Sequence, residues 1–289
     1  MSSHPIISRL AVCILIISCD GQKQEKNLFE NGEPLGVNKN GNLEEVSGLA
    51  ASATNPGHLW AHNDSGHPAK LFLLDTMAKT KKVFTLLNSG NRDWEDIALG
   101  PGPDENSSYL YVGDIGDNLS RYDVKYIYRL PEPRLDQNKE INDVDIMAVI
   151  LSGGEQDTEA LMSDPVSHNL YLISKRGDAA GIYEITNPFA SDTVVAQKQG
   201  AIPYTHITAG DISPDGKEVL MKNYKNIYYW KKKGNETIPE LLKTPAAELP
   251  YDRENQGEAI AWARDGSGFY TLGENARGER ARLFFYKRK

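Results

Sequence analysis

Acidic side chains recur at one position of a β-rich segment that repeats along this 289-residue chain. In four of the five repeats a carboxylate stands one or two positions before a Leu or Ile residue. These residues are Glu95, Glu159, Asp211 and Glu258. Carboxylates that converge on one point repel each other unless a cation or protons compensate. Ca²⁺ takes roughly 6–8 oxygen ligands in a flexible shell, so the pattern predicts a calcium site.

A second set of oxygen ligands follows the next β-rich run of three repeats. It comprises Asn63, Asp114 and Asn223. Other acids lie beside the two sets, namely Asp64, Asp93, Asp96, Asp117, Asp157 and Glu274. The three residues of the second set are expected to complete the metal shell together with the four carboxylates. Zinc is not expected, because the histidines show no ligand spacing. Purely structural roles, in which these side chains accept hydrogen bonds from loop amides, remain the alternative.

Four basic residues lie close in sequence to these acids. They are Arg92, Lys175, Arg176 and Lys222. They are expected to bind an anionic substrate next to the metal, although each could instead pair with a neighbouring carboxylate. His206 and His62 are the candidate general bases, and a loop histidine without a chemical role is the alternative for both.

Short β-rich runs separated by Gly, Pro, Asn and Asp clusters surround these residues, a pattern typical of an all-β protein. The Leu or Ile anchors of the five repeats lie roughly 50 residues apart, close to the length of one four-stranded blade. They are Leu49, Ile97, Leu161, Ile212 and Ile260. The sequence therefore predicts a β-propeller of about five four-stranded blades, with six as the alternative. One blade is enlarged by a loop over 131–142.

The last repeat ends after its third strand, near Lys289. A strand from the segment 28–37 is expected to complete this blade and to close the ring. The fourth strand of the fourth repeat is expected over 240–243. In such a ring the loop entering the first strand and the loop leaving the second strand emerge on one face. The predicted ligands therefore meet at the mouth of the central channel.

The N-terminal segment has the features of a secretory signal. Arg9 precedes an apolar run over 10–17, which is too short to span a bilayer. Ile16-Ile17-Ser18-Cys19 resembles the lipobox of bacterial lipoproteins. We expect a signal peptide over 1–18, a lipidated Cys19 with a polar tether over 19–27, and a propeller domain over 28–289. An ordinary secretory signal or a short anchor is the alternative.

The expected location is the bacterial cell envelope, with the protein lipid-anchored and extracytoplasmic, either periplasmic or at the cell surface. The net charge of −8 is spread along the chain, which argues against a nucleic-acid partner. The expected partners are the membrane, through the lipid, and a small anionic molecule or surface ligand. The protein is expected to be a monomer.

Four short segments resemble a loose superfamily of secreted propellers. They are Ser47-Gly48-Leu49, Trp94-Glu95-Asp96-Ile97-Ala98, Glu159-Ala160-Leu161 and Glu258-Ala259-Ile260. The superfamily includes phytase-like proteins ("esterase-like activity of phytase") and, more remotely, NHL, SMP-30 and paraoxonase-type calcium-dependent lactonases. The resemblance implies Ca²⁺ bound at the channel mouth by Glu95, Glu159, Glu258, Asn63 and Asn223, and hydrolysis of esters, lactones or phosphates.

Two classes of function follow. The first is a Ca²⁺-dependent hydrolase acting on a small anionic ester, phosphoester or lactone. The second is a non-catalytic, surface-anchored propeller that binds a glycan, a peptide or a partner protein. The chain departs from the resemblance because it has five repeats in place of six blades, and because its spacing assigns no His-Asp pair.

Overall fold

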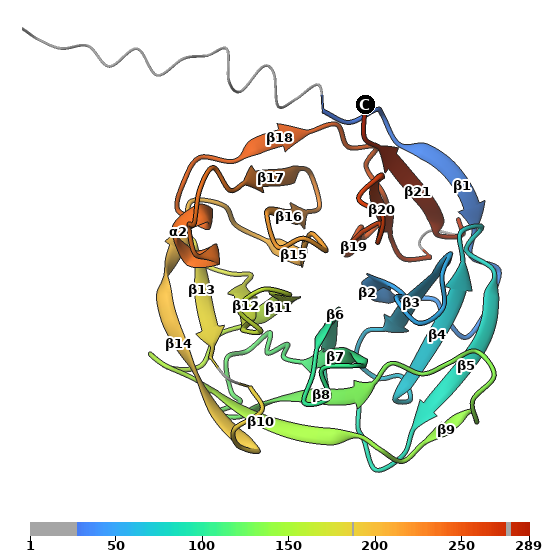
Figure 1. Ribbon diagram of the computed structural model, residues 1–289, viewed down its shortest axis with the longest axis horizontal. Coiled ribbons are helices and arrows are strands. Elements are labelled where there is room, and N and C mark those ends of the chain that lie inside the picture. Colours follow the sequence, from blue (N-terminus) through green and yellow to red (C-terminus); the bar gives the residue numbers. More distant parts are fainter. Residues whose placement is uncertain (1–27, 187, 276–278) are drawn as a thin grey trace, which may run out of the picture.

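Five blades radiate from a central axis in the computed structural model, which describes residues 28–186, 188–275 and 279–289 (Figure 1). Two neighbouring blades share one eight-stranded sheet, so the blades form four hydrogen-bonded sheets. The prediction of an all-β propeller with five blades is confirmed. Within each blade the chain runs from the inner strand outward, and neighbouring strands are antiparallel. Each blade therefore presents the start of its inner strand and the end of its second strand on the same face.

The blades follow one another in chain order. Blade 1 consists of β2 (Val46–Ala51), β3 (His58–Asn63), β4 (Lys70–Asp75) and β5 (Thr80–Leu86). Blade 2 consists of β6 (Trp94–Pro101), β7 (Ser108–Asp114), β8 (Lys125–Pro131) and β10 (Asp145–Leu151). Blade 3 consists of β11 (Thr158–Ser163), β12 (Leu170–Ser174), β13 (Ala180–Ile185) and β14 (Thr193–Ile202). Blade 4 consists of β15 (Ile207–Ile212), β16 (Glu218–Asn223), β17 (Ile227–Lys231) and β18 (Ala247–Leu249).

Blade 5 combines the first and the last described strands. It consists of β19 (Ala259–Trp262), β20 (Gly268–Leu272), β21 (Arg282–Lys287) and β1 (Glu33–Val37). β1 pairs antiparallel with β21, so the segment expected to close the ring does close it (Figure 1). A further bridge between Phe29 and Arg288 extends this pairing. Because a strand from the N-terminal side completes the last blade, no sheet is left one strand short.

Outer strands also connect neighbouring blades. β9 (Glu140–Ile141) lies in the enlarged loop and pairs parallel with β5, while β10 pairs parallel with β14. The same loop begins with Glu132, which accepts hydrogen bonds from the Trp60 indole at 2.8 Å and the Thr54 N–H at 2.9 Å. The predicted insertion is therefore a structural tie between blade 2 and blade 1.

The fourth strand of blade 4 was expected over 240–243, and that prediction is wrong. Residues 240–242 lie in α2 (Ile238–Leu242), Lys243 caps the end of this helix, and the strand is β18, several residues later. Thr237 caps the helix in a reciprocal capping box with Glu240, and Pro239 stands in its first turn. These are helix-start signals, and they outweigh the apolar pair Leu241-Leu242. No helix among the described residues is long and apolar enough to cross a membrane.

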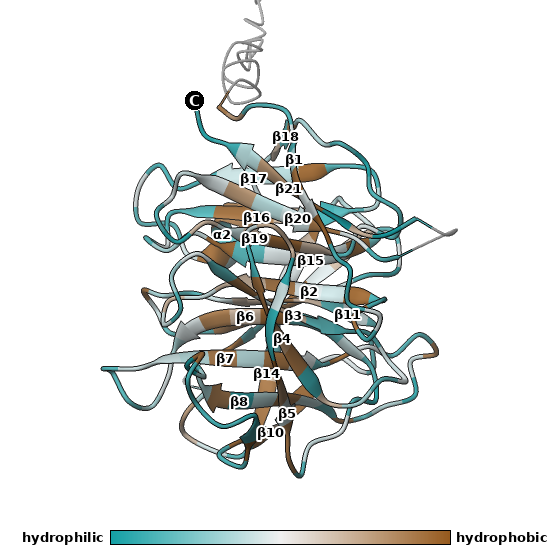
Figure 2. Cartoon of the chain, turned by 90° about the vertical axis from the view of Figure 1, so that its right-hand side faces the viewer, coloured by the Kyte–Doolittle hydropathy of each residue, from teal (hydrophilic) through white to brown (hydrophobic). Residues whose placement is uncertain are grey.

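Apolar packing between neighbouring blades forms the core. One cluster of buried side chains lies at each of the five blade-to-blade interfaces. In Figure 2 the apolar colour is concentrated on the strands, and the connecting loops are mostly hydrophilic. Each square ångström of buried apolar surface contributes about 25 cal/mol. The five interfaces therefore fix the blades around the axis and determine which loops meet at the mouth.

The inner strands β2, β6, β11, β15 and β19 lie side by side around the axis. Asp96, on β6, is fully buried there, and its carboxylate accepts three backbone hydrogen bonds. They come from the N–H groups of Ile97 at 2.9 Å, Leu161 at 3.0 Å and Gly210 at 3.3 Å. Asp96 therefore connects the inner strands of three blades, and its role is structural.

Candidate functional site

Four of the five inner strands begin with an irregular pairing. At the second residue of β2, β6, β11 and β15 the register shifts, so that this residue has no partner in the pairing with the next strand. The residues without a partner are Ser47, Glu95, Glu159 and Thr208. A bulge of this kind re-aims the side chain of the extra residue. Glu258 directly precedes β19 and takes the same place in blade 5. The recurring acidic position is thus a recurring bulge.

The prediction that Asp211 supplies the corresponding carboxylate of blade 4 is wrong. The counterpart is Thr208, because the fourth repeat aligns on Gly210 and not on Ile212. Asp211 lies farther along β15, and its carboxylate accepts the backbone N–H of Trp262 at 2.8 Å. Burial raises the pKa of Asp211 to about 7. Its role is to join two inner strands.

Seven carboxylates from four blades gather at the mouth, and we call this set the acidic ring. Its members are Asp64, Asp93, Glu95, Asp157, Glu159, Glu258 and Glu274. They form three groups in which ligand oxygens lie within 4.8 Å of one another. The groups are Asp64–Asp93–Glu95, Asp64–Glu258–Glu274 and Glu95–Asp157–Glu159. Asp64 and Glu95 each belong to two groups, so the ring is continuous.

Burial and mutual repulsion disfavour the ionised forms of these acids. Burial, followed by the charges of Asp64 and Asp157, raises the pKa of Asp93 to about 6. Burial raises the pKa of Glu159 to about 7, although Lys175 opposes the shift. Burial and then the Glu258 charge raise the pKa of Glu274 to about 8. A cation would reverse these shifts by favouring the charged carboxylates.

Only two basic side chains among the described residues form ion pairs with the ring. Lys175 Nζ lies 2.8 Å from Glu159, and Arg176 Nε lies 2.7 Å from Asp157. Lys175 is also positioned 5.5 Å from the centre of the Tyr224 ring, whose hydroxyl donates a hydrogen bond to Glu258. Two positive charges cannot neutralise seven ionised carboxylates, so protons or a cation must compensate the others. The ring therefore has the composition of a site for an added cation.

The environment of Glu95 is unfavourable for an ionised carboxylate. Its side chain is only 3% exposed, and among the described residues no donor forms a hydrogen bond to its carboxylate. Burial, followed by the charges of Glu159 and Asp64, raises its pKa well above the ordinary value. Leaving a buried polar group without a partner costs about 1–3 kcal/mol, and more for a charge. A proton or an added cation would supply the compensation that this carboxylate does not receive from the described residues.

A glycine lets the chain pass close to these acids. A side chain at Gly116 would clash with the carboxylates of Glu95 and Asp93. The Gly116 N–H donates to the Asp93 carbonyl at 3.1 Å, which holds this loop against the ring. The absence of a Cβ at Gly116 keeps open the space between the carboxylates.

Asn63 and Asn223, both expected as ligands, lie outside the ring. Asn63 Oδ1 accepts the N–H groups of Glu44 at 3.0 Å and Glu45 at 3.1 Å. Asn223 Nδ2 donates to the Thr205 carbonyl at 3.0 Å. Each amide thus fixes the loop that enters the inner strand of its own blade. Backbone N–H groups already occupy the side-chain oxygens of both residues, and those of Lys225 and Asn226 donate to Asn223 Oδ1 at 2.9 Å each.

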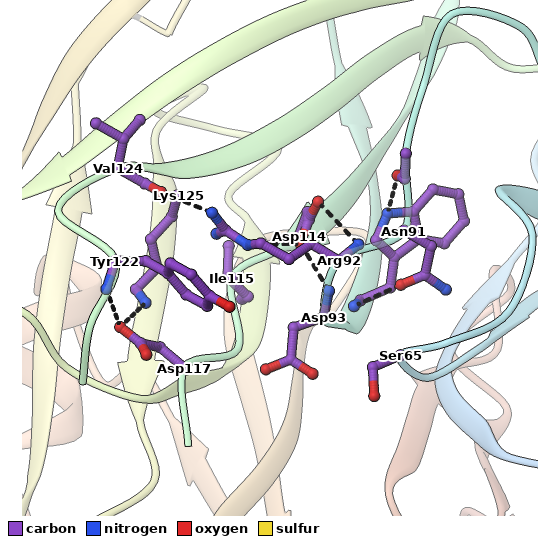
Figure 3. A network of polar contacts seen from close by, with 12 residues as sticks. Ser65, Asn91, Arg92, Asp93, Asp114, Ile115, Asp117, Tyr122, Val124 and Lys125 are labelled. Atoms are coloured by element: carbon purple, nitrogen blue, oxygen red, sulfur yellow. Dashed lines mark hydrogen bonds and ion pairs between the residues drawn. The ribbon is translucent and has the colours of Figure 1, made fainter. Parts of the chain in front are cut away.

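Asp114 has the same role in blade 2 and is likewise not a ring member. Its carboxylate accepts the Asp93 N–H at 2.9 Å and lies 3.7 Å from Arg92 Nε (Figure 3). The Arg92 guanidinium stacks 4.0 Å from the centre of the Tyr122 ring. Asp114 therefore holds the segment that presents Asp93, and Arg92 is engaged within the protein.

Lys222 is fully buried beneath the mouth, where its Nζ lies 3.2 Å from Glu254. Of the four basic residues expected to bind substrate, Lys175 and Arg176 contact the ring, whereas Arg92 and Lys222 are held by other protein groups. An anion at the mouth would meet Lys175 and Arg176 first. Lys222 has no exposed surface to offer it.

The two candidate bases differ in accessibility. His62 is completely buried, with its Nε2 against the backbone of β2 and β6 and without a hydrogen-bond partner among the described residues. Burial lowers the pKa of His62 to about 4. His62 therefore cannot exchange a proton with a ligand at the mouth. His206 is exposed, and its backbone N–H donates to the Lys175 carbonyl at 2.8 Å.

The ring includes four acids to which the sequence assigned no ligand role, although it placed them beside the predicted set. They are Asp64, Asp93, Asp157 and Glu274. Asp64 directly follows Asn63, which is an expected ligand, and Asp93 directly follows Arg92, which is an expected substrate-binding residue. The feature of the sequence that pointed to these acids was their high density around each strand end. Neighbouring side chains in a loop point in different directions, and this determines which acids reach the mouth.

The signal peptide over 1–18, the lipidated Cys19 and the tether over 19–27 lie outside the described residues. The structure begins at Leu28, directly before the segment that closes the ring.

Comparisons with known proteins identify the fold alone. No family model matches the chain, and no curated protein matches it. Among solved structures, it is similar to the PQQ-bound form of an aldose sugar dehydrogenase from Streptomyces coelicolor. The identity is 11% and the TM-score 0.53, over 90% of this chain and 98% of that one. This likeness supports the β-propeller fold and carries no cofactor or activity with it.

Two further structures are more distant. A nidogen/laminin complex gives 12% identity and a TM-score of 0.47, covering 83% of each chain. Hydrazine synthase from Kuenenia stuttgartiensis gives 15% identity and a TM-score of 0.42, covering 81% of this chain and 78% of that one.

Proposed function

We propose that the acidic ring binds Ca²⁺ and that the bound ion promotes hydrolysis of a small anionic ester, phosphoester or lactone. The observation that supports this proposal is the imbalance at the mouth, where seven carboxylates face two paired basic residues. Such an arrangement is expensive without a cation. A bound divalent ion can polarise a substrate oxygen or activate water.

The composition of the ring favours calcium over other metals. Its described ligands are carboxylate oxygens, which suit hard cations, and neither a thiolate nor an imidazole lies in any of the three groups. Ca²⁺ accepts a larger and more irregular oxygen shell than Mg²⁺, which requires near-octahedral geometry. The three overlapping groups provide such a shell. Glu95, Glu159 and Glu258 would be ligands in this proposal, as the sequence predicted.

The groups around the ring have separate tasks in this proposal. Tyr224 and Lys175 orient Glu258 and Glu159 through direct contacts. His206 is the proposed general base, because its imidazole is exposed and its backbone is tied to that of Lys175. Arg176 would contact the anionic part of the substrate with the exposed half of its side chain.

Calorimetric titration of the full-length protein with CaCl₂ tests the metal site. We expect saturable binding that is weakened about tenfold or more by the double substitution Glu95→Gln and Glu258→Gln. Glu105→Gln, at an exposed acid remote from the ring, is the control. Unchanged affinity in the double variant would disprove the proposal. Assays with ester, lactone and phosphoester substrates, with and without chelator, then test hydrolysis.

A second candidate is a non-catalytic propeller that binds a glycan, peptide or partner protein at the same mouth. One observation favours it: Arg92 and Lys222 are both held by protein groups and are not free for a substrate. In that case calcium binds and ligand binding is calcium-dependent, while the substrate panel shows no turnover. The two candidates therefore differ in one measurable result.

The proposed location is the cell envelope, with Cys19 lipidated and the propeller on the extracytoplasmic side. Extracellular calcium modules work at dissociation constants of about 10⁻⁴–10⁻³ M, so a low-affinity ring would be occupied there. Mass spectrometry of the N-terminal peptide from a bacterial expression host is the direct test. A diacylated or triacylated Cys19 is expected, and Cys19→Ala should release the protein from the membrane fraction.

A further inference from the structure

A cavity of about 640 Å³ lies on blade 5, beside the acidic ring. Its walls come from β1, from β21, from the loop that precedes β19 and from the described residues of the loop that follows β20. Arg253, Arg280 and Arg282 line it together with Glu274, and Pro34 and Phe284 supply apolar surface. It is built where β1 pairs with β21 (Figure 1).

The three arginines of this cavity differ from most others in the protein. Five of the ten arginines in the described residues form ion pairs with Asp or Glu, namely Arg92, Arg129, Arg134, Arg176 and Arg288. None of the ion pairs found in the described part of the chain includes Arg253, Arg280 or Arg282. Three of the five arginines without such a partner therefore share one cavity, in a protein with 40 acidic residues.

Backbone geometry brings these arginines together from two parts of the chain. The Glu274 N–H donates to the carbonyls of Asn255 at 3.1 Å and Gln256 at 3.2 Å, which brings the loop carrying Arg253 against the end of β20. A side chain at Gly273 would clash with that loop, 2.6 Å from the Asn255 carbonyl. The third arginine, on β21, stands opposite Val37 of β1.

The acids that line the cavity do not pair with these arginines. The Glu254 carboxylate is already engaged by Lys222, Tyr251 and Thr271 at 3.2, 3.1 and 3.0 Å. Glu279 is exposed to solvent. Glu274 belongs to the acidic ring through Asp64 and Glu258. The cavity and the ring thus share one wall.

We propose that this cavity is an oxyanion subsite, which binds a carboxylate or phosphate group of the ligand whose other part is held at the acidic ring. A guanidinium presents parallel N–H donors that match the geometry of both oxyanions. Phe284 and Pro34 contact the apolar portion of the ligand between its two anchors. The proposal rests on the proposed function for the metal-bound end, while anion binding by the arginines is independent of the metal.

The test measures anion binding by the arginines separately from calcium binding by the acidic ring. Metal-free protein, prepared on a chelating resin, is titrated in parallel with sodium phosphate and with sodium malonate. We expect one saturable site for at least one of the two anions. The double substitution Arg280→Gln and Arg282→Gln should weaken this binding about tenfold or more. It should leave calcium affinity within about twofold, which also shows that the variant is folded.

The matched control is Arg121→Gln with Arg264→Gln. Both residues are exposed, neither takes part in an ion pair of the described chain, and neither lines this cavity. Removing them changes the net charge by the same amount. An equal loss of anion affinity in the control would overturn the proposal, because it would mean that only overall charge matters. Absence of saturable anion binding would overturn it as well.

Failure of the proposed function gives a different result. If the acidic ring does not bind calcium, the titrations with CaCl₂ fail while metal-free anion binding persists. If the subsite is absent, calcium binds and the anion titrations fail. In the calcium-loaded protein, malonate should bind more tightly than in the metal-free protein, because the ion and the arginines then attract the same ligand.

Discussion

Individual carboxylates at the mouth lack the solvation that an exposed acid obtains from water. Glu95 shows this most clearly, because it is buried, accepts no hydrogen bond among the described residues and faces other acids. Asp96, which is also buried, accepts three backbone hydrogen bonds. Two adjacent acids in the same strand therefore have opposite roles. The carboxylate of Asp96 is satisfied by the fold, whereas that of Glu95 is a ligand in the proposed calcium site.

Glu95→Gln is expected to separate metal binding from stability. The substitution removes a ligand charge, so calcium affinity should fall about tenfold or more. It also removes a buried charge without a partner, so the metal-free variant should melt about 2–4 °C higher than the wild type. Calorimetry and thermal denaturation measure the two effects. A variant that loses stability in the absence of metal would contradict this account of Glu95.

Gly116→Ala should weaken calcium binding although it removes no ligand. The added methyl group would occupy the space between Glu95 and Asp93 and force their carboxylates apart. We expect an affinity loss of about tenfold, on the scale seen when groups that orient metal ligands are disturbed. Gly41→Ala is the control, since a methyl group there meets nothing within 4 Å. Equal affinity in Gly116→Ala and the wild type would exclude this position for the ion.

At the scale of elements, strand β1 does most to hold the ring closed. Its pairing with β21 continues into the segment around Phe29, which is fully buried between blades 4 and 5. Phe29 packs 5.9 Å from Tyr229 and 5.1 Å from Phe269, measured between ring centroids. A segment far from these residues in sequence therefore completes the last interface.

Phe29→Ala should lower the free energy of unfolding by about 3–5 kcal/mol, the usual cost of removing a large buried aromatic side chain. Chemical denaturation monitored by fluorescence provides the measurement. Leu119→Ala, at a side chain that is 66% exposed, serves as the control and should change stability by less than about 0.5 kcal/mol. If both variants unfold at the same denaturant concentration, the N-terminal segment does not stabilise the ring.

Element boundaries were least predictable where two local signals competed. In blade 4 the apolar residues over 240–243 suggested a strand, but the cap formed by Thr237 and Glu240 starts a helix there. In the same blade an apolar anchor at Ile212 displaced the alignment by two residues and assigned Asp211 to the ring. The bulge that makes Thr208 the true counterpart depends on how β15 pairs with β16. Sequence spacing does not reveal it.

At the scale of the whole molecule, the acidic ring exists because five blades close on themselves. Its members come from blades 1, 2, 3 and 5, and no blade alone provides more than two of them. The repulsion between them is a property of the closed fold and is absent from the unfolded chain. Stability in the absence of metal should therefore depend on pH.

The pH dependence has a definite sign. In the folded state the pKa values of Glu159 and Glu274 are raised to about 7 and about 8, against about 4.3 for an unperturbed Glu. The folded state therefore binds these protons more tightly. The resulting stabilisation is complete below about pH 4 and is lost as the pH rises through 7 to 8.

Metal-free protein should accordingly melt at a lower temperature at pH 8.5 than at pH 6.5. This window lies above the range in which His62, with a pKa lowered to about 4, contributes the opposite trend. Excess calcium should abolish most of the decline, because the ion favours the ionised carboxylates. Glu159→Gln with Glu274→Gln should reduce the decline without metal, and the part that Asp211 contributes, with its pKa of about 7, should remain. An unchanged melting temperature across the window in metal-free protein would refute the assignment.

The amino-acid sequence was sufficient to predict the number of blades and the closure of the ring by the N-terminal strand. It was also sufficient to predict three ring members, Glu95, Glu159 and Glu258. These features follow from local periodicity and from repetition, which each segment carries within itself. The other ring members depend on contacts between distant segments. Asn63 and Asp114 accept hydrogen bonds from backbone N–H groups of loops. Asp64 and Asp93 are each next in sequence to a residue with a predicted role, and their side chains point into the ring. The direction in which a loop side chain points is determined by strand pairing and by packing between blades. It is therefore defined only in the closed ring.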